Sequence, residues 1–291
     1  SIAGTMFRLP WRAASPLIAR SSIRAFSAAP TELRVERLVE PHAGVTIVTL
    51  DRPAARNSLG KNLLGELQDA VAALHHDRET RVVIFNSAVE KVFCAGADLK
   101  ERATMPEEEV GPFVERLRAT FTAIEQLPMP TIAAIEGAAL GGGLELALGC
   151  DLRVAGNKAV LGVPETSLAI IPGAGGTQRL PRLIGLGRAK ELMFTADRIG
   201  SERAEEIGLV NYAVEGGTAT DRALDIAARI AKNGPIAVRL AKKAASAGMQ
   251  ADISTGMDIE RGCYAQVITT KDRLEGLAAF REKRMPNYTS E

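Results

Sequence analysis

The segment 136–153 reads EGAALGGGLELALGCDLR, and three consecutive glycines in it separate a strand-like run from an apolar, helix-like run. A helix that begins directly after a strand leaves its first backbone N–H groups unpaired, at the positive end of the helix dipole. Glycine has no side chain, so another molecule can approach this backbone closely. The segment alone is compatible with a tight strand-to-helix turn and with a ligand-binding loop.

Two acidic residues in and after this segment are candidates for proton transfer. Glu145 lies within the apolar run LELALGC, and Glu165 follows a strand-like run in LGVPETSLAIIPGAGGTQRL, directly after Pro164. Acids are seldom buried without a partner, and perturbed acids concentrate at functional sites. Of two carboxyl groups beside a carbonyl, one can activate water while the other moves a proton to carbon. A purely structural role for both acids is the alternative.

A second loop has the same character as the glycine segment. The stretch VEKVFCAGADLKE (89–101) ends a strand-like run with Ala95-Gly96-Ala97 and then continues into polar residues. Two such loops can each direct one N–H group at a single oxygen, which is the arrangement of an oxyanion hole. Removing one donor from such a hole typically costs roughly 2.7–4 kcal/mol of transition-state stabilisation. The presence of both loops favours a ligand site over a pair of turns.

Other catalytic signatures are missing from the sequence. There is no GxSxG elbow and no Cys–His pair, and no lysine follows GAGGTQ (173–178) as a phosphate-binding loop requires. That glycine cluster is either a helix-entry turn or one wall of an acyl pocket, and both interpretations remain open. The histidines His42, His75 and His76 have no metal-ligand spacing, so we expect no metal site.

Around these loops, strand-like and helix-like segments alternate along the chain. Strands are predicted at 44–50, 81–85, 131–137, 151–156 and 209–214, and helices at 57–76, 106–127 and 144–150. This pattern predicts an α/β fold of stacked β-β-α units over parallel sheets. From about residue 219 one helix follows another, so we place a boundary near 215–230.

The composition is typical of an ordinary globular chain. Of the 291 residues, 46% are apolar and 24% are charged, and no apolar run is long enough to cross a membrane. The three cysteines, Cys94, Cys150 and Cys263, lie far apart in the sequence. We therefore expect free thiols in a reducing compartment rather than a disulfide framework.

The first thirty residues differ from the rest, because they contain four arginines and several serines but no acid. This composition is typical of a mitochondrial transit peptide, which would be disordered. The whole chain carries a net charge of +1, and without those four arginines the remainder carries −3. A slightly acidic body does not suit nucleic-acid binding, which needs a basic face.

Three motifs in the same order resemble the crotonase family of enoyl-CoA hydratases and isomerases. They are FCAGADLKE, IEGAALGGGLELALGCD and PETSLAIIPGAGGTQRLPRLIG, and the resemblance extends from about residue 33 to 288. It implies a crotonase-like spiral of β-β-α units over 31–220, preceded by the leader 1–30 and followed by a C-terminal helical trimerisation region, 221–291. The assembly that it implies is a hexamer made of two trimers.

The resemblance also implies roles for individual residues. The N–H groups of Ala97 and Gly142 would hold the thioester oxygen, and Glu145 and Glu165 would add water syn across the 2,3-double bond of an enoyl-CoA. Both acids are present, which favours a hydratase. The other positions implied to contact substrate or coenzyme A are Arg56, Ala95, Asp98, Leu99, Lys100 and Gly173, with Phe280 and Lys283 closing a neighbouring subunit's site. Coenzyme A would arrive as part of the substrate, and no other cofactor is expected.

Within the family, the resemblance is strongest to mitochondrial hydratases that convert 3-methylglutaconyl-CoA in leucine degradation. That substrate carries a distal carboxylate, which Arg102, just past the second loop, could contact. The first alternative is a short-chain enoyl-CoA hydratase of fatty-acid β-oxidation. The second is an RNA-binding crotonase-fold protein, but the matching helix 57–76 carries a single lysine, Lys61, which argues against RNA. A mitochondrial matrix location is expected.

Overall fold

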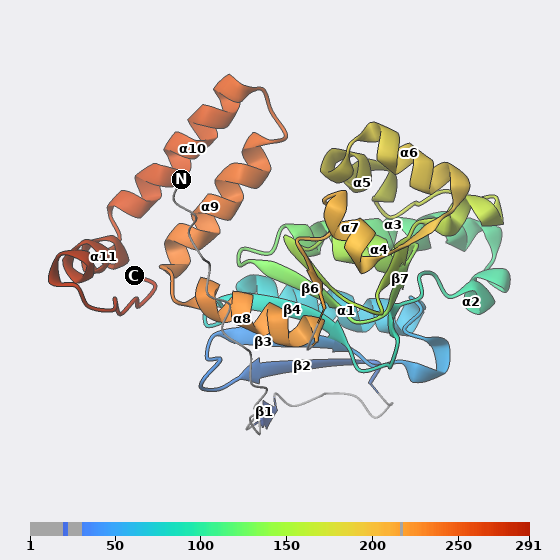
Figure 1. Cartoon of the computed structure of the whole chain (residues 1–291), viewed down its shortest axis with the longest axis horizontal. Helices are drawn as coiled ribbons and strands as arrows, with labels where there is room; N and C mark the ends of the chain where they lie inside the picture. Colours follow the sequence, from blue (N-terminus) through green and yellow to red (C-terminus); the bar gives the residue numbers. More distant parts are fainter. Residues whose placement is uncertain (1–19, 23–30, 216–217) are drawn as a thin grey trace, which may run out of the picture.

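The computed structural model describes residues 20–22, 31–215 and 218–291, in which helices surround two β-sheets (Figure 1). The large sheet has seven strands in the order β1 (Arg20–Ser22), β2 (Leu33–Leu38), β3 (Val45–Leu50), β4 (Val82–Ser87), β6 (Thr131–Ile135), β8 (Leu152–Gly156) and β11 (Tyr212–Val214). The small sheet has four strands in the order β10 (Arg198–Gly200), β9 (Val160–Gly162), β7 (Ala138–Leu140) and β5 (Val92–Cys94).

The helices lie between and outside the strands. They are α1 (Lys61–His76), α2 (Leu99–Ala103), α3 (Glu107–Glu125), α4 (Gly142–Leu148), α5 (Gly176–Ile184), α6 (Leu186–Thr195), α7 (Ser201–Glu206), α8 (Ala219–Ala231), α9 (Pro235–Gly248), α10 (Ile253–Ile268) and α11 (Lys271–Glu282), with two 3₁₀ helices, η1 (Pro53–Ala55) and η2 (Pro164–Leu168). Among the described residues, no helix combines the length and apolarity needed to cross a membrane.

The chain forms a spiral, because it passes repeatedly from the large sheet to the small one. Strands β4, β6 and β8 belong to the large sheet, and each is followed by a strand of the small sheet, β5, β7 or β9. Within each sheet these successive strands run parallel. Parallel neighbours need a crossover, which helices supply between the turns of the spiral. This arrangement confirms the predicted α/β fold of β-β-α units.

The edges of the two sheets add antiparallel pairs to the predicted parallel strands. β2 pairs with β3 in the antiparallel direction, and so does β10 with β9. For β2 and β3 the cause is the short connection, residues 39–44. A parallel pair would need a crossover of about a dozen residues or more, whereas a short turn permits only a hairpin.

The main hydrophobic core fills the space between the sheets and the helices α1, α3 and α4. All six residues of β3 are buried, as expected for a strand covered on both faces. The apolar side of α1 is formed by the buried residues Leu63, Leu64, Leu67, Val71 and Leu74, which is the set that helical periodicity predicts. The three cysteines are buried free thiols, as expected.

Two predicted helix starts are shifted. The helix predicted from residue 57 begins at Lys61, because Asn57 takes a left-handed φ of 53° and is fully buried. Its side-chain amide donates to the Ser87 hydroxyl at 2.8 Å and to the Phe93 carbonyl at 3.0 Å. The short helix predicted at 144–150 begins earlier, at Gly142. Helices α5 and α6 were not predicted, because both are short and they contain or adjoin Pro181 and Gly185, residues that are typical of turns.

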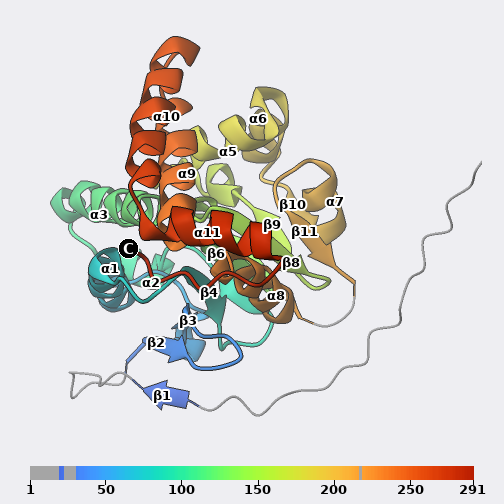
Figure 2. The ribbon, with the colours of Figure 1, turned by 90° about the vertical axis from the view of Figure 1, so that its left-hand side faces the viewer.

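The C-terminal helices divide into two groups. Helix α8 packs on the large sheet, where it buries Ala223, Leu224, Ile226 and Ala227 in a second core cluster with β4, β6 and β8. Helices α9, α10 and α11 extend away from the sheets, on the side opposite α2 (Figures 1 and 2). Helices follow one another from Ala219, and the first of them, α8, packs on the large sheet. The division of the chain at residue 220 stays a prediction.

The predicted leader, residues 1–30, lies outside the described residues except for Arg20–Ser22. These three residues form β1 and pair with Glu36–Leu38 of β2 in the antiparallel direction. An edge strand such as β2 presents unpaired backbone groups that another segment can satisfy. The expected disorder of the leader stays a prediction.

Candidate active site

The glycine segment forms the turn from β7 into α4. Gly141 is the N-cap of α4, with φ 53° and ψ −124°, a backbone conformation that only glycine adopts readily. Gly143 packs so closely on β5 that a Cβ atom there would lie 2.1 Å from the carbonyl oxygen of Cys94. The glycines are thus required both for the sharp turn and for the contact between the two predicted loops.

The backbone nitrogens of Ala97 and Gly142 lie close to each other. A Cβ atom on Gly96 would lie 3.4 Å from the Gly142 nitrogen, and one on Gly142 would lie 3.8 Å from the Ala97 nitrogen. The bonds from Leu59 N–H to the Gly96 carbonyl, 2.7 Å, and from Asp98 N–H to the Leu59 carbonyl, 3.3 Å, hold the loop on either side of Ala97. Within the described chain, neither of the two N–H groups has a hydrogen-bond acceptor, so both can receive an oxygen from a ligand.

Glu145 is buried in α4, with 3% of its surface exposed. Its Oε1 atom accepts N–H bonds from Ala174 at 2.8 Å and from Gly176 at 2.7 Å, at the start of α5. Burial raises the pKa of Glu145, while these two bonds and the positive charges of Arg179 and Arg118 oppose the increase. The N-terminus of a helix favours a negative charge. Glu145 is therefore held as an oriented hydrogen-bond acceptor.

Glu165 has a different environment, at the start of the 3₁₀ helix η2. Its Oε2 atom is buried and has no hydrogen-bond partner in the described part of the chain. Burial, and to a smaller extent the charge of Glu145, raises the pKa of Glu165 to about 7. An acid with this pKa still holds its proton over much of the neutral range, so it can donate the proton to a ligand.

The two acids and the two free amides converge on the turn before α4. The Oε1 atom of Glu165 lies 2.9 Å from the position that a Cβ atom on Gly141 would occupy. The charge of the Glu145 carboxylate acts on Glu165, so the two carboxyl groups lie within electrostatic reach of each other. Two carboxyl groups with opposed hydrogen-bonding environments thus lie beside two amide donors. This arrangement suits proton transfer next to a carbonyl whose oxygen develops negative charge.

Several residues expected to contact coenzyme A are brought to one loop pair. The Ala95 N–H donates to the Arg56 carbonyl at 3.2 Å, and the side chains of Arg56, Leu99 and Lys100 are exposed. Asp98 is directed inward instead: its carboxylate caps α2 and pairs with Arg52 at 2.8 Å. The Asp98 carboxylate is therefore already hydrogen-bonded and ion-paired within the protein.

Phe280 and Lys283 are not brought to the acids within this chain. Both lie at the end of α11, which is on the opposite side of the molecule from α2 and the loop at 95–100 (Figure 1). Phe280 is 87% exposed. Their expected contact with a substrate would therefore require a second subunit, which remains a prediction.

The glycine cluster 173–176 has a role that the sequence left open. Besides starting α5, it supplies the two N–H groups that hold Glu145. A Cβ atom on Gly176 would lie 3.0 Å from the Glu145 Oε1 atom, so the close approach depends on glycine. The sequence signal was the acid-free glycine run before a helix, which is a ready anion site, but nothing in the sequence indicated that Glu145 is its anion.

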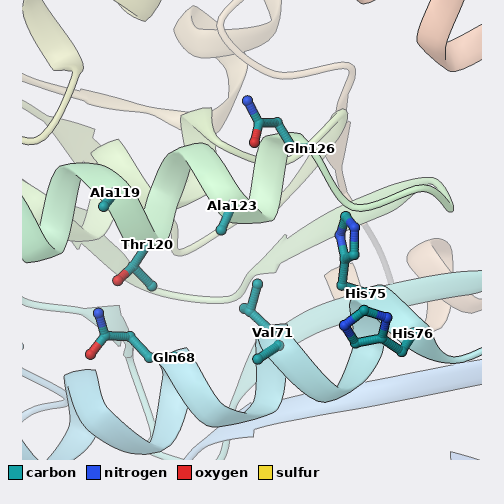
Figure 3. Close-up of a pocket in the computed structure, with 9 residues that line it drawn as sticks. Gln68, Val71, His75, His76, Ala119, Thr120, Ala123 and Gln126 are labelled. Atoms are coloured by element: carbon teal, nitrogen blue, oxygen red, sulfur yellow. The ribbon is translucent and has the colours of Figure 1, made fainter.

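Two grooves of the described structure lie away from the acids. One, of about 420 Å³, runs between α1 and α3 and is bordered by the exposed His75 and His76 at the end of α1 (Figure 3). The other, of about 650 Å³, lies between α9 and α10 and is lined mostly by alanine and larger apolar side chains. The acids and the two amides are therefore distinguished as a site by their hydrogen bonds and charges rather than by a cavity.

The raised pKa of Glu165 leads to a prediction about stability. The native state holds this proton up to about pH 7, whereas an unperturbed glutamate releases it near pH 4.5. Wild-type protein should therefore lose part of its stability as the pH rises through this window, and Glu165→Gln should not. We expect the melting temperature of Glu165→Gln minus that of wild type to be larger at about pH 8 than at about pH 4.5. If this difference in melting temperature did not change with pH, the raised pKa of Glu165 would be contradicted.

Comparison with known proteins adds relatives for the whole chain. The family model described as enoyl-CoA hydratase/isomerase matches residues 40–291. The chain is 52% identical over 289 residues to enoyl-CoA hydratase domain-containing protein 2, mitochondrial, of Bos taurus, covering 98% of this chain and 97% of the relative. It is 53% identical over 264 residues to methylglutaconyl-CoA hydratase, mitochondrial, of Rattus norvegicus, covering 89% and 84%.

A solved structure is similar over most of its length. The crystal structure of enoyl-CoA hydratase from Bacillus anthracis superposes with a TM-score of 0.86 and 54% sequence identity, and the match covers 90% of this chain and 100% of that one. The two proteins are therefore similar in sequence as well as in fold.

Proposed function

The chain belongs to the enoyl-CoA hydratase/isomerase family, and from this premise we propose that it hydrates 3-methylglutaconyl-CoA to 3-hydroxy-3-methylglutaryl-CoA, a step of leucine degradation. The class of enzyme, a hydro-lyase of the enoyl-CoA hydratase type, follows from the family and from relatives at 53% identity. The choice of substrate is the proposal. It is supported by relatives with that name and by the position of Arg102.

The observation that carries the proposal is the pairing of two unlike carboxyl groups with two free amides. The thioester oxygen would bind between the N–H groups of Ala97 and Gly142, which draw electrons from the double bond toward the carbonyl. Water would be held by Glu145 and Glu165 on one face of the double bond. Amides fixed in advance stabilise charge that develops on the oxygen without having to reorient.

The addition would transfer two protons. As the water oxygen forms its bond to C3, one of its protons passes to Glu145, which is held as an acceptor by two N–H bonds. Negative charge moves through C2 toward the thioester oxygen, and Glu165 donates its proton to C2. The proton left on Glu145 returns to Glu165 through the next bound water. Hydration changes no oxidation state, so we expect no redox cofactor, and coenzyme A enters as part of the substrate.

Arg102 supports the choice of a substrate with a distal carboxylate. It lies on α2, just past the loop that carries Ala97, and its backbone N–H bonds to the Asp98 carbonyl at 2.8 Å. Its side chain is half-buried, with the guanidinium 5.7 Å from the centre of the Phe113 ring. In the part of the chain that the structure describes, no carboxylate forms an ion pair with it. A half-buried cation beside the site is suited to bind an acidic acyl group.

The test of substrate and of Arg102 is a substrate panel, measured by loss of enoyl-thioester absorbance. We expect wild-type protein to hydrate 3-methylglutaconyl-CoA with a higher kcat/KM than crotonyl-CoA. Arg102→Ala should lower kcat/KM for 3-methylglutaconyl-CoA by roughly tenfold to a hundredfold, because a hydrogen bond to a charged group contributes about 1.5–3 kcal/mol. It should leave crotonyl-CoA hydration nearly unchanged.

Two outcomes would separate the alternatives. An equal loss on both substrates would show that Arg102 does not recognise the carboxylate. A wild-type preference for crotonyl-CoA would favour the short-chain hydratase of fatty-acid β-oxidation. Lys100→Ala is a matched control, since Lys100 is exposed on the same short helix and is expected to affect both acyl groups alike.

We further propose a homo-oligomer, a hexamer made of two trimers, in the mitochondrial matrix. Large apolar side chains are exposed along α9–α11, including Ile253, Tyr264 and Phe280, and contiguous exposed apolar surface marks interaction sites. The location is supported by the names of relatives called mitochondrial. We do not propose RNA as a partner, because Lys61 is paired with Glu109 at 2.7 Å.

A further inference from the structure

The peptide unit between Gly173 and Ala174 joins an arginine to Glu145. Its N–H group, on Ala174, donates to the Glu145 Oε1 atom at 2.8 Å. Its C=O group, on Gly173, accepts two bonds from the Arg118 guanidinium, from Nε at 3.2 Å and from Nη2 at 3.0 Å. In a planar trans peptide the C=O and N–H bonds point in opposite directions. Fixing the oxygen therefore also fixes the direction of the N–H bond.

A positive charge at the carbonyl also strengthens the N–H donor. Hydrogen bonds in a chain polarise one another, and bonds to a charged group are stronger than bonds between neutral groups. The Arg118 guanidinium acts on Glu145 in two ways: through the shared peptide, and directly through space, where its positive charge opposes the increase in the pKa of Glu145 that burial causes.

The next peptide unit is held by a second arginine. Arg179 donates from Nη1 to the Ala174 carbonyl at 3.3 Å, and its other bonds anchor it to α3, to Glu125 at 2.7 Å and to the Thr122 hydroxyl at 3.0 Å. Arg118 also belongs to α3. Helix α3 thus holds the Gly173 carbonyl directly through Arg118, and the Ala174 carbonyl indirectly through Arg179 of α5, although α3 itself contributes no hydrogen bond to the Glu145 carboxylate.

From this geometry we propose that Arg118 is a positioning residue for Glu145, which it holds in its reactive orientation through the peptide between Gly173 and Ala174. The proposal rests on the hydration mechanism proposed above, in which Glu145 accepts a proton from water. Arg118 itself contacts neither the substrate nor the reacting atoms in this mechanism. The charged groups that act on Glu145 are Arg118 of α3, Arg179 of α5 and Glu165 of η2, and the two arginines are in turn paired with Glu115 and Glu125.

The principal test is Arg118→Met, which keeps an unbranched apolar stem and removes the charge and the hydrogen-bond donors of the side chain. We expect kcat to fall by roughly tenfold to a hundredfold, because small misplacements of a catalytic group have effects of this size. KM should change by less than about twofold. The acid limb of the pH profile of kcat should move to higher pH, since removing the cation lets the pKa of Glu145 rise.

Two further variants separate positioning from general support of the fold. Arg118→Lys keeps the positive charge but cannot donate two hydrogen bonds from a planar guanidinium to the Gly173 carbonyl. Compared with Arg118→Met, it should return the acid limb of the pH profile to its wild-type position and recover only part of kcat. Arg116→Met is the matched control: Arg116 lies on the same helix but bonds to Gln68 at 2.7 Å instead of to the glycine loop. It should leave kcat and the pH profile unchanged.

A double-mutant cycle with Glu145→Gln tests whether Arg118 acts through Glu145. In the Glu145→Gln background, Arg118→Met should change the remaining rate by less than about twofold, because the carboxylate that it positions is gone. An equal loss in both backgrounds would overturn the proposal, and so would an unchanged kcat in Arg118→Met.

Hydrogen exchange of the Ala174 amide provides a readout that needs no substrate. The amide should exchange faster in Arg118→Met than in wild type and Arg116→Met, as its partners are held less firmly. If wild-type protein hydrates no enoyl-CoA, the proposed function fails, but exchange still decides whether Arg118 fixes this peptide. Unchanged exchange would overturn the inference in either case.

Discussion

Replacing Glu165 by glutamine is expected to lower kcat by about a thousandfold to ten-thousandfold, at the upper end of the effects of general acid catalysts. The amide keeps the shape of the side chain but cannot give up a proton to C2. The proton of the native carboxyl is available because burial and the nearby Glu145 raise its pKa to about 7. Stopped-flow or steady-state measurement of enoyl-thioester absorbance checks the rate. Incorporation of deuterium at C2 of the product checks the proton transfer to that carbon.

This variant should bind substrate normally and remain folded. Glu165 provides no hydrogen bond to the rest of the protein through its Oε2 atom in the described residues, so the amide replaces an unpaired oxygen. Glu205→Gln, on the exposed side of α7, is a matched control that should keep full activity. If Glu165→Gln retained more than about a tenth of the wild-type rate, Glu165 could not be the proton donor.

Glu145→Gln is expected to produce a loss of similar size, through failure to accept the proton of water.

Replacing Gly96 by alanine is expected to lower kcat by about a hundredfold to a thousandfold, which is the effect of losing one oxyanion donor. Gly96 has φ +94°, where an L side chain is strained, and its Cβ atom would lie 2.7 Å from the Leu140 carbonyl oxygen. The same atom would lie 3.4 Å from the Gly142 nitrogen. The backbone must therefore shift, and both N–H groups that face the ligand oxygen shift with it.

The loss should appear in kcat more than in KM, because the amides act most strongly on the charge that develops in the transition state. Gly65→Ala is the matched control. Gly65 lies within α1, no atom lies within 4 Å of its added Cβ, and alanine in a helix interior is favourable by about 1 kcal/mol. That variant should be active and slightly more stable. Normal kinetics of Gly96→Ala in a folded protein would contradict the assignment of the oxyanion hole.

The site could be predicted in part from local sequence, because some of its parts are neighbours along the chain. Gly141 to Glu145 lie in one turn of structure, and the need for glycine before α4 is visible in the three consecutive glycines. The partner of Glu145 could not be predicted in the same way. Ala174 and Gly176 lie about thirty positions further along the chain, and their amides reach the carboxylate only after α4 and α5 have packed together.

The fold, like the site, could be predicted only in part from local sequence. Periodicity identified the buried face of α1, since every third or fourth residue of a helix lies on one side. It did not distinguish α8, which packs on the large sheet, from α9–α11, which extend away from it, because the spacing of apolar residues does not say which other element covers them. Which apolar face finds a partner within the chain is a property of the packed structure.

The sequence by itself determined the family, the β-β-α order, and the acids and glycines that proton transfer beside a carbonyl requires, because these depend on residue type and on spacing along the chain. Only the tertiary structure decided which amides hold Glu145, why Glu165 keeps its proton near neutral pH, and that Arg118 of α3 bonds the Gly173 carbonyl in the loop that holds Glu145. The physical reason is that hydrogen bonding and desolvation depend on distances in space, and these join segments that no local pattern relates.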